Sequence, residues 1–126
     1  MNLAESSDCA TLKVLDAAWV VRDMGDDLEG YKDVAGFFVE DVRAMRAQIL
    51  ACGTQPVVGM VPLIHEVANS MGVVGAWRGV CALRGIERRL RAGESIAAPL
   101  VTETVLQHLD ETVKALQAWL AGPEAA

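Results

Sequence analysis

Apolar residues recur at every third or fourth position along most of this chain, the spacing that lines one face of an α-helix. The pattern predicts a short helix within 11–24 and longer ones over 28–51, 56–71 and 76–92, with a last helix from Pro99 to the stop at Gly122-Pro123. No stretch alternates apolar and polar residues over a useful length, so no sheet is expected. The pattern predicts an all-α fold, an antiparallel up-and-down four-helix bundle with a short additional N-terminal helix.

Residues that start or stop helices refine these boundaries. Asp16 can cap the short helix. Gly53 ends the long helix, and Thr54 can cap the next one, with Pro56 in its first turn. Residues 1–10 are expected to be a flexible N-terminus, residues 11–122 the helical domain and residues 123–126 a flexible C-terminal tail.

The helix predicted over 56–71 contains two residues that weaken helices, Gly59 and Pro62. A proline in a helix interior removes a hydrogen bond, at a cost of about 3 kcal/mol. Either this helix kinks one turn before His65, or it begins near Val61. On a helical wheel His65 lies beside the apolar stripe, so its imidazole is expected to face solvent. The stripe holds Val57, Met60, Val61, Ile64, Val67, Ala68 and Met71, and the side turned away from it holds Pro62, Glu66 and Asn69.

Composition limits the classes of function. The chain has 126 residues, enough for one domain with a core, and 52% of them are hydrophobic, which argues against disorder. The net charge of -6 argues against nucleic acid as the main partner. No apolar run reaches the roughly 18 residues that span a bilayer, and the N-terminus lacks the features of a signal peptide. No membrane partner is therefore expected.

The three cysteines, Cys9, Cys52 and Cys81, are odd in number, lie far apart and form no C-x-x-C pair. A disulfide framework or a metal site is therefore not expected. The pattern favours reduced thiols in a cytoplasmic protein, with Cys81 as a small core residue.

The run that begins at His65 carries the most informative pattern. Ala68 and Asn69 follow it at three and four positions, and Gly75-Ala76 begins ten positions on. Together with the order of the elements over 14–120, the run resembles the histidine-containing phosphotransfer (HPt) domains of bacterial two-component phosphorelays. In that family a lysine follows the histidine at three positions, often a glycine at four, and a small residue, usually glycine, at ten. Ala68 here replaces the lysine and Asn69 the glycine. Three further features match, namely Phe37-Phe38, Ile86-Glu87 and Gly93 after a basic stretch.

The resemblance implies that His65 accepts a phosphoryl group from a phospho-aspartate in the receiver domain of a response regulator and passes it on. The partners would be that receiver domain, a hybrid histidine kinase or both. The receiver would supply Mg²⁺, so no cofactor or metal of the chain's own is expected. A monomer is expected, and no ATP-dependent kinase activity, since the chain has no phosphate-binding loop.

Other residues near His65 have expected roles. Asn69, one turn further along the helix, would donate its amide N–H to a phosphoryl oxygen. The expected docking surface for the partner consists of Val58, Pro62, Glu66, Ala68 and Gly72.

Two other functions stay open at this point. A non-catalytic module of the same fold would dock a receiver or kinase without carrying phosphate, and Ala68 in the lysine position supports it. A helical regulator that binds something unrelated is a more distant alternative. His108 is expected to be structural or solvated, and the tryptophans are expected to pack in the core or at an end of the bundle. The arginines Arg84, Arg88, Arg89 and Arg91 are expected to form a solvated face or a contact for an acidic partner.

Overall fold

The computed structural model describes residues 7–52 and 57–122. Within these two ranges every regular element is a helix and no strand occurs, so the all-α prediction is confirmed. In chain order the helices are α1 (Ser7–Thr11), α2 (Ala17–Asp23), α3 (Leu28–Cys52), the 3-10 helix η1 (Val57–Met60), α4 (Val61–Val74), α5 (Trp77–Arg91) and α6 (Ala98–Ala121).

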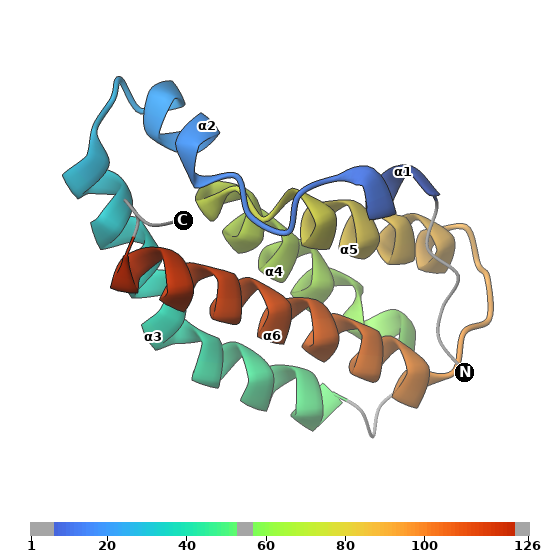
Figure 1. Ribbon diagram of the computed structural model, residues 1–126. Coiled ribbons are helices and arrows are strands. Elements are labelled where there is room, and N and C mark those ends of the chain that lie inside the picture. The colour runs from blue at the N-terminus through green and yellow to red at the C-terminus, as the bar shows by residue number, and fades with distance from the viewer. Residues whose placement is uncertain (1–6, 53–56, 123–126) are drawn as a thin grey trace.

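The four long helices pack around a common core (Figure 1). Helix α3 contacts α4 and α6, and α5 contacts the same two helices. The short helices lie outside this group, with α1 against α5 and α2 against α3 and α4. Fully burying one large apolar side chain contributes about 1.5–3 kcal/mol, so this core is the main source of stability. Its largest fully buried side chains include Tyr31, Ile49, Met60, Ile64, Met71, Leu83, Leu109 and Leu116.

Most of the predicted boundaries agree with the structure to within a few residues. Helix α4 begins at Val61, directly after η1, so the second of the two alternatives for this segment is confirmed. Pro62 then lies in the first turn, where a missing N–H costs little. The side chain of Asp16 caps α2 by accepting a hydrogen bond from the backbone N–H of Trp19 at 3.2 Å, as predicted. The predictions for Gly53, Thr54 and Pro56 fall outside the described residues.

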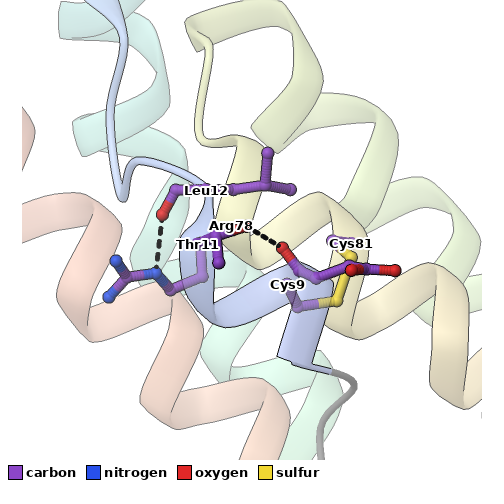
Figure 2. The surroundings of a disulfide bond; sticks show 6 residues. Cys9, Thr11, Leu12, Arg78 and Cys81 are labelled. Atoms are coloured by element: carbon purple, nitrogen blue, oxygen red, sulfur yellow. Dashed lines mark hydrogen bonds between the residues drawn. A yellow bond between two sulfur atoms is a disulfide. The ribbon is translucent and has the colours of Figure 1, made fainter.

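The N-terminal part of the chain differs from the prediction. The short helix expected within 11–24 is α2, but residues 7–10, expected to be flexible, belong to a further helix, α1. The reason is a disulfide bond between Cys9 and Cys81, which ties α1 to α5 (Figure 2). Beside it, Nε of Arg78 donates to the backbone carbonyl of Leu12 at 2.9 Å. These contacts hold the segment on α5, although it is too short to be a stable helix alone.

The expectation that all cysteines are reduced thiols is therefore wrong for Cys9 and Cys81, whose Cα atoms lie 5.5 Å apart. The odd cysteine count did not exclude one pair, and a sequence separation of 72 gives no sign of proximity. Cys52 is the free cysteine of the described residues. Disulfides persist in oxidising surroundings and are rare in the cytosol, so this bond argues against the cytoplasmic location, which stays a prediction.

Helices η1 and α4 together form one long apolar stretch. Val57–Val74 is long and apolar enough to cross a membrane by length and composition, with a mean hydropathy of 1.4, and 39% of it is buried inside the protein. The sequence-based statement that no apolar stretch reaches the required length is therefore wrong when hydropathy is averaged. The core helix of a globular domain passes the same test, and α4 carries six buried side chains. The absence of a membrane partner stays a prediction.

The turn between α4 and α5 depends on Gly75. Its φ of +85° is the left-handed conformation that glycine adopts without strain at the end of a helix. A Cβ atom here would lie 2.7 Å from Cγ2 of Val20 and 2.9 Å from the backbone oxygen of Asp16. The carbonyl of Gly75 also accepts a hydrogen bond from the N–H of Asp16 at 2.9 Å. The turn is thus packed against the start of α2.

We expect Gly75→Ala to lower the free energy of unfolding by about 2–3 kcal/mol, since it adds both backbone strain and overpacking. Gly36→Ala is the matched control, because a Cβ atom at Gly36 in α3 meets nothing within 4 Å. The control is expected to be neutral or to stabilise the helix by up to about 1 kcal/mol. Denaturant unfolding of both variants provides the measurement, and equal midpoints for the two would contradict the role of Gly75.

We expect Cys9→Ser to destabilise the protein by about 2–4 kcal/mol, because the lost disulfide closes a long loop in the unfolded chain. Reductant should lower the thermal midpoint of the wild type to that of Cys9→Ser and leave the variant unchanged. Cys52→Ser, which alters the free thiol, is the control and should keep the response to reductant. A thermal midpoint of the wild type that does not change with reductant would contradict this stabilising role of the disulfide.

Candidate functional site

Helix α4 presents His65 at the edge of its buried face. Ile64 and Val67 point into the core with at most 1% of their surface exposed, whereas the side chain of His65 is 44% exposed. Pro62, Glu66 and Asn69 are exposed. The prediction that His65 lies beside the core stripe and faces solvent is confirmed. A fixed helix thus carries a reachable imidazole.

Two side chains of α5 contact one ring nitrogen of His65. Nδ1 lies 3.1 Å from each carboxylate oxygen of Glu87 and 2.9 Å from Nη1 of Arg84. Nε2 makes no hydrogen bond to any of the described residues. The protein therefore holds the ring by Nδ1, and none of the described residues hydrogen-bonds to Nε2.

The chemistry of these partners links each position of the ring proton to one of the two contacts. A carboxylate only accepts hydrogen bonds and a guanidinium only donates them. If Nδ1 carries the proton, it donates to Glu87 and Nε2 has a free lone pair. If Nδ1 is bare, it accepts from Arg84 and the proton is on Nε2, which is then no nucleophile. The Glu87 contact is thus the one that prepares His65 for attack at Nε2.

Glu87 is a buried carboxylate within a cluster of positive charge. Its side chain is 9% exposed, and it contacts Nη1 of Arg84 at 3.2 Å and Nη2 of Arg91 at 2.9 Å. Burial raises the pKa of Glu87, but the hydrogen bond with His65, the charge of Arg91 and the hydrogen bond from Arg84 outweigh it and hold the pKa below its ordinary value. Glu87 is therefore ionised at neutral pH and able to accept the Nδ1 proton.

The predicted docking residues have different positions. Val58 is 63% exposed, Pro62 and Glu66 are exposed, and Gly72 is partly exposed. Ala68 has no exposed surface, so its assignment to the docking surface is wrong. It lies on the buried side of α4, in the same core stripe where the helical wheel put it.

Asn69 is close to the site, but its side-chain oxygen is already occupied. Nη2 of Arg84 donates to Oδ1 of Asn69. The two residues thus link α4 to α5 one turn beyond His65. The structure brings Asn69 together with Arg84 rather than directly with the imidazole.

The sequence does not reveal the roles of Arg84 and Glu87. It predicts Arg84 on a solvated face or at a contact for an acidic partner, and Glu87 only as part of the Ile86-Glu87 match. One signal was available: Arg84, Glu87 and Arg91 are spaced by three and four, so they share one side of α5 next to the inward-facing Ile86 and Leu90. Arg88 is exposed as expected, and Arg89 pairs with Glu94. His108 is buried in α6.

An apolar surface continues from α4 onto α3. Phe37 of α3 is 63% exposed, and Val73 of α4 is 57% exposed. These two side chains line a groove of about 260 Å³ together with Val34, Phe38, Asp41, Met45, Ser70 and Val74. On the wheel, Val73 lies on the same exposed side of α4 as Pro62. His65 is thus near one edge of the exposed face of α4 and the groove is at the other.

Within residues 7–52 and 57–122, no three His, Cys, Asp or Glu side chains are grouped so that they could hold a metal ion. The expectation that the chain has no metal or cofactor of its own stays a prediction. The charges nearest His65 come from Glu87 and the arginines instead.

We expect the stability that Glu87 contributes to depend on pH. Its pKa is lower in the folded than in the unfolded protein, so the unfolded state binds more protons as the pH falls. The stability contributed by Glu87 is fully present above the ordinary carboxyl pKa of about 4.3. It is lost as the pH falls through the lower pKa that Glu87 has in the folded protein. The difference in unfolding free energy between wild type and Glu87→Gln should therefore narrow below about pH 4. This change with pH should be larger for Glu87→Gln than for Glu66→Gln, because Glu66 is an exposed neighbour of His65. A difference in unfolding free energy that stays constant with pH for Glu87→Gln would contradict the prediction.

Comparisons with known proteins assign no family to this chain. No family model matches it, and no match was found among the curated proteins or the solved structures. A functional conclusion therefore depends on the chain's own residues and on the geometry around His65.

Proposed function

We propose that this protein is a histidine phosphotransfer protein of a bacterial phosphorelay. His65 accepts a phosphoryl group from a phospho-aspartate of a response-regulator receiver domain and passes it to another acceptor. The observation that carries the proposal is the hydrogen bond between Nδ1 of His65 and the buried Glu87 carboxylate, on a side chain that is 44% exposed and whose Nε2 has no hydrogen bond to the described residues. The resemblance to HPt domains around the same residue supports it.

The geometry suits an in-line transfer. The lone pair of Nε2 attacks phosphorus, the bond between phosphorus and the aspartate oxygen breaks, and the aspartate leaves as a carboxylate. The proton stays on Nδ1, so the phosphorylated ring becomes positively charged. Glu87, 3.1 Å from Nδ1, stabilises this charge as it forms. Fixing the ring in advance lowers the entropic cost of reaching the attack geometry.

The proposal also includes the arrangement of the four long helices. An antiparallel up-and-down bundle of α3, α4, α5 and α6, with α1 and α2 as additions, places His65 on the outer side of one bundle helix. The pairing of the four helices supports it, because each of α3 and α5 contacts both α4 and α6.

The receiver would dock on the exposed face of α4. Pro62 and Val73 are apolar and exposed there, with exposed Val58 on η1 directly before α4 and Phe37 on α3 in the same groove as Val73. Exposed apolar patches often mark protein interaction sites. The receiver would bring Mg²⁺ with its own phospho-aspartate, and a hybrid histidine kinase is the other expected partner. A cytoplasmic, monomeric protein is part of the proposal.

A docking module that carries no phosphate is the alternative. Ala68 favours it, because this residue is fully buried and α4 therefore offers no cation at the position of the family's lysine.

We expect phosphorylated receiver domains to transfer phosphate to the wild type and not to His65→Gln. The product should be the acid-labile, base-stable phosphate typical of a histidine. Circular dichroism should show that His65→Gln is folded, because the side chain is 44% exposed and little core is altered. Receiver binding without transfer would favour the docking module, and the absence of both binding and transfer would contradict both functions.

A further inference from the structure

We propose that Arg84 binds the phosphoryl group on His65 and supplies the positive charge that Ala68 cannot supply. The inference depends on the proposed phosphotransfer function and names a further residue of the same site. Within the described residues, no other lysine or arginine has an atom within hydrogen-bonding distance of His65. Arg84 reaches it from the neighbouring helix, 19 residues further along the chain.

The contacts at Nδ1 show that Arg84 must change partners when the site works. Nη1 of Arg84 and the carboxylate of Glu87 both face Nδ1, at 2.9 Å and 3.1 Å. Once Nδ1 carries the proton, it faces the N–H of Arg84 as one donor against another. Nη1 then has no acceptor on the ring and keeps its contact with Oε1 of Glu87 at 3.2 Å. A phosphoryl oxygen on Nε2 offers a new acceptor beside the same ring.

The guanidinium lies at the Nδ1 edge of the ring, so the side chain of Arg84 has to turn toward Nε2 to reach this acceptor. The side chain of Arg84 is 31% exposed, at the boundary between the α4–α5 contact and solvent. A guanidinium has five N–H donors, and the contacts of Arg84 within the described residues use only Nη1 and Nη2. The planar fork binds two phosphate oxygens at once, and such charge-assisted bonds are among the strongest hydrogen bonds in proteins.

Of the other arginines of α5, Arg78 donates to the backbone carbonyl of Leu12, and the rest contact acidic side chains or are exposed. Arg91 contacts Oε2 of Glu87 at 2.9 Å, and Arg89 forms two hydrogen bonds with Glu94. Arg88 is exposed. Arg84 is therefore the cation of this helix that is best placed to neutralise a group on His65.

Asn69 acquires a different role from the one expected. Its Oδ1 accepts a hydrogen bond from Nη2 of Arg84, so it orients the guanidinium over the edge of α4. Asn69 is thus a positioning residue that acts through Arg84. Its removal should matter less than removal of Arg84 and should have no further effect once Arg84 is replaced.

The test uses phosphoramidate as a small phosphodonor, which needs no partner protein. Nε2 attacks phosphorus, the P–N bond of the zwitterionic donor breaks, ammonia leaves, and the Nδ1 proton remains on the ring. Rates of phosphorylation and half-lives of phospho-His65 are measured for wild type, Arg84→Gln, Arg84→Lys and Asn69→Ala. Arg88→Gln is the control, because it removes the same charge from an exposed position of the same helix.

Arg84→Gln should slow phosphorylation or shorten the half-life roughly tenfold, as expected for the loss of one charge-assisted hydrogen bond. Arg84→Lys should lie between this variant and the wild type, Asn69→Ala should show a smaller loss, and Arg88→Gln should match the wild type. A wild type that is phosphorylated at His65 while Arg84→Gln behaves identically overturns this inference and leaves the proposed function intact. A wild type that takes no phosphate overturns both.

A second measurement keeps the test decisive if Arg84→Gln does not fold. The guanidinium ¹⁵N resonances of Arg84 in the wild type, assigned by their loss in Arg84→Lys, should shift when His65 is phosphorylated. The resonances of Arg88 should stay in place. Unchanged Arg84 resonances overturn the inference whatever the variants show.

Discussion

The close approach of α5 to α4 is the constraint on which the rest of the site depends. Gly79 of α5 packs against Met71 of α4, and a Cβ atom there would lie 2.9 Å from the Met71 sulfur. A larger residue would push the helices apart unless this side chain moved. Gly75 turns the chain back after α4, so residues further along α5 come level with residues further back along α4. Arg84 meets Asn69 in this way, and Glu87 meets His65.

Glu87 shows how the fold supports a charge close to its core. Removing a carboxylate from water costs several kcal/mol unless the group is paired and hydrogen-bonded. Glu87 has Arg84, Arg91 and His65 as partners, two of them on its own helix. Desolvation offsets much of the attraction in such a cluster, so its net gain over well-packed apolar residues is small, while its hydrogen bonds fix the geometry of its members. Here the fixed quantity is the direction of the His65 ring.

Much of the helical fold could be predicted from the sequence, because helix formation follows from local periodicity. The same periodicity placed His65 at the edge of the buried stripe of α4, and Pro62 made a start near Val61 one of two alternatives. The contacts between helices could not be predicted in this way. Arg84 lies 19 residues from His65 along the chain, and Cys81 lies 72 residues from Cys9. Only the packing of one helix on another brings each pair together. A wheel shows which side of a helix a residue occupies, but not what packs against it.

Helix α5 is held on two sides, and both contacts help to fix the positions of Arg84 and Glu87. Its inner side is packed on α4 at Gly79, and its outer side is joined to α1 through Cys81. Cys81 is one turn before Arg84, and Arg78 adds hydrogen bonds to the backbone carbonyls of Leu12 and Lys13. The short α1 could not hold α5 through its own core, because only Cys9 of its side chains in residues 8–11 is buried. The covalent bond supplies what burial does not, so the helix that carries Arg84 and Glu87 is fixed from outside as well as from within.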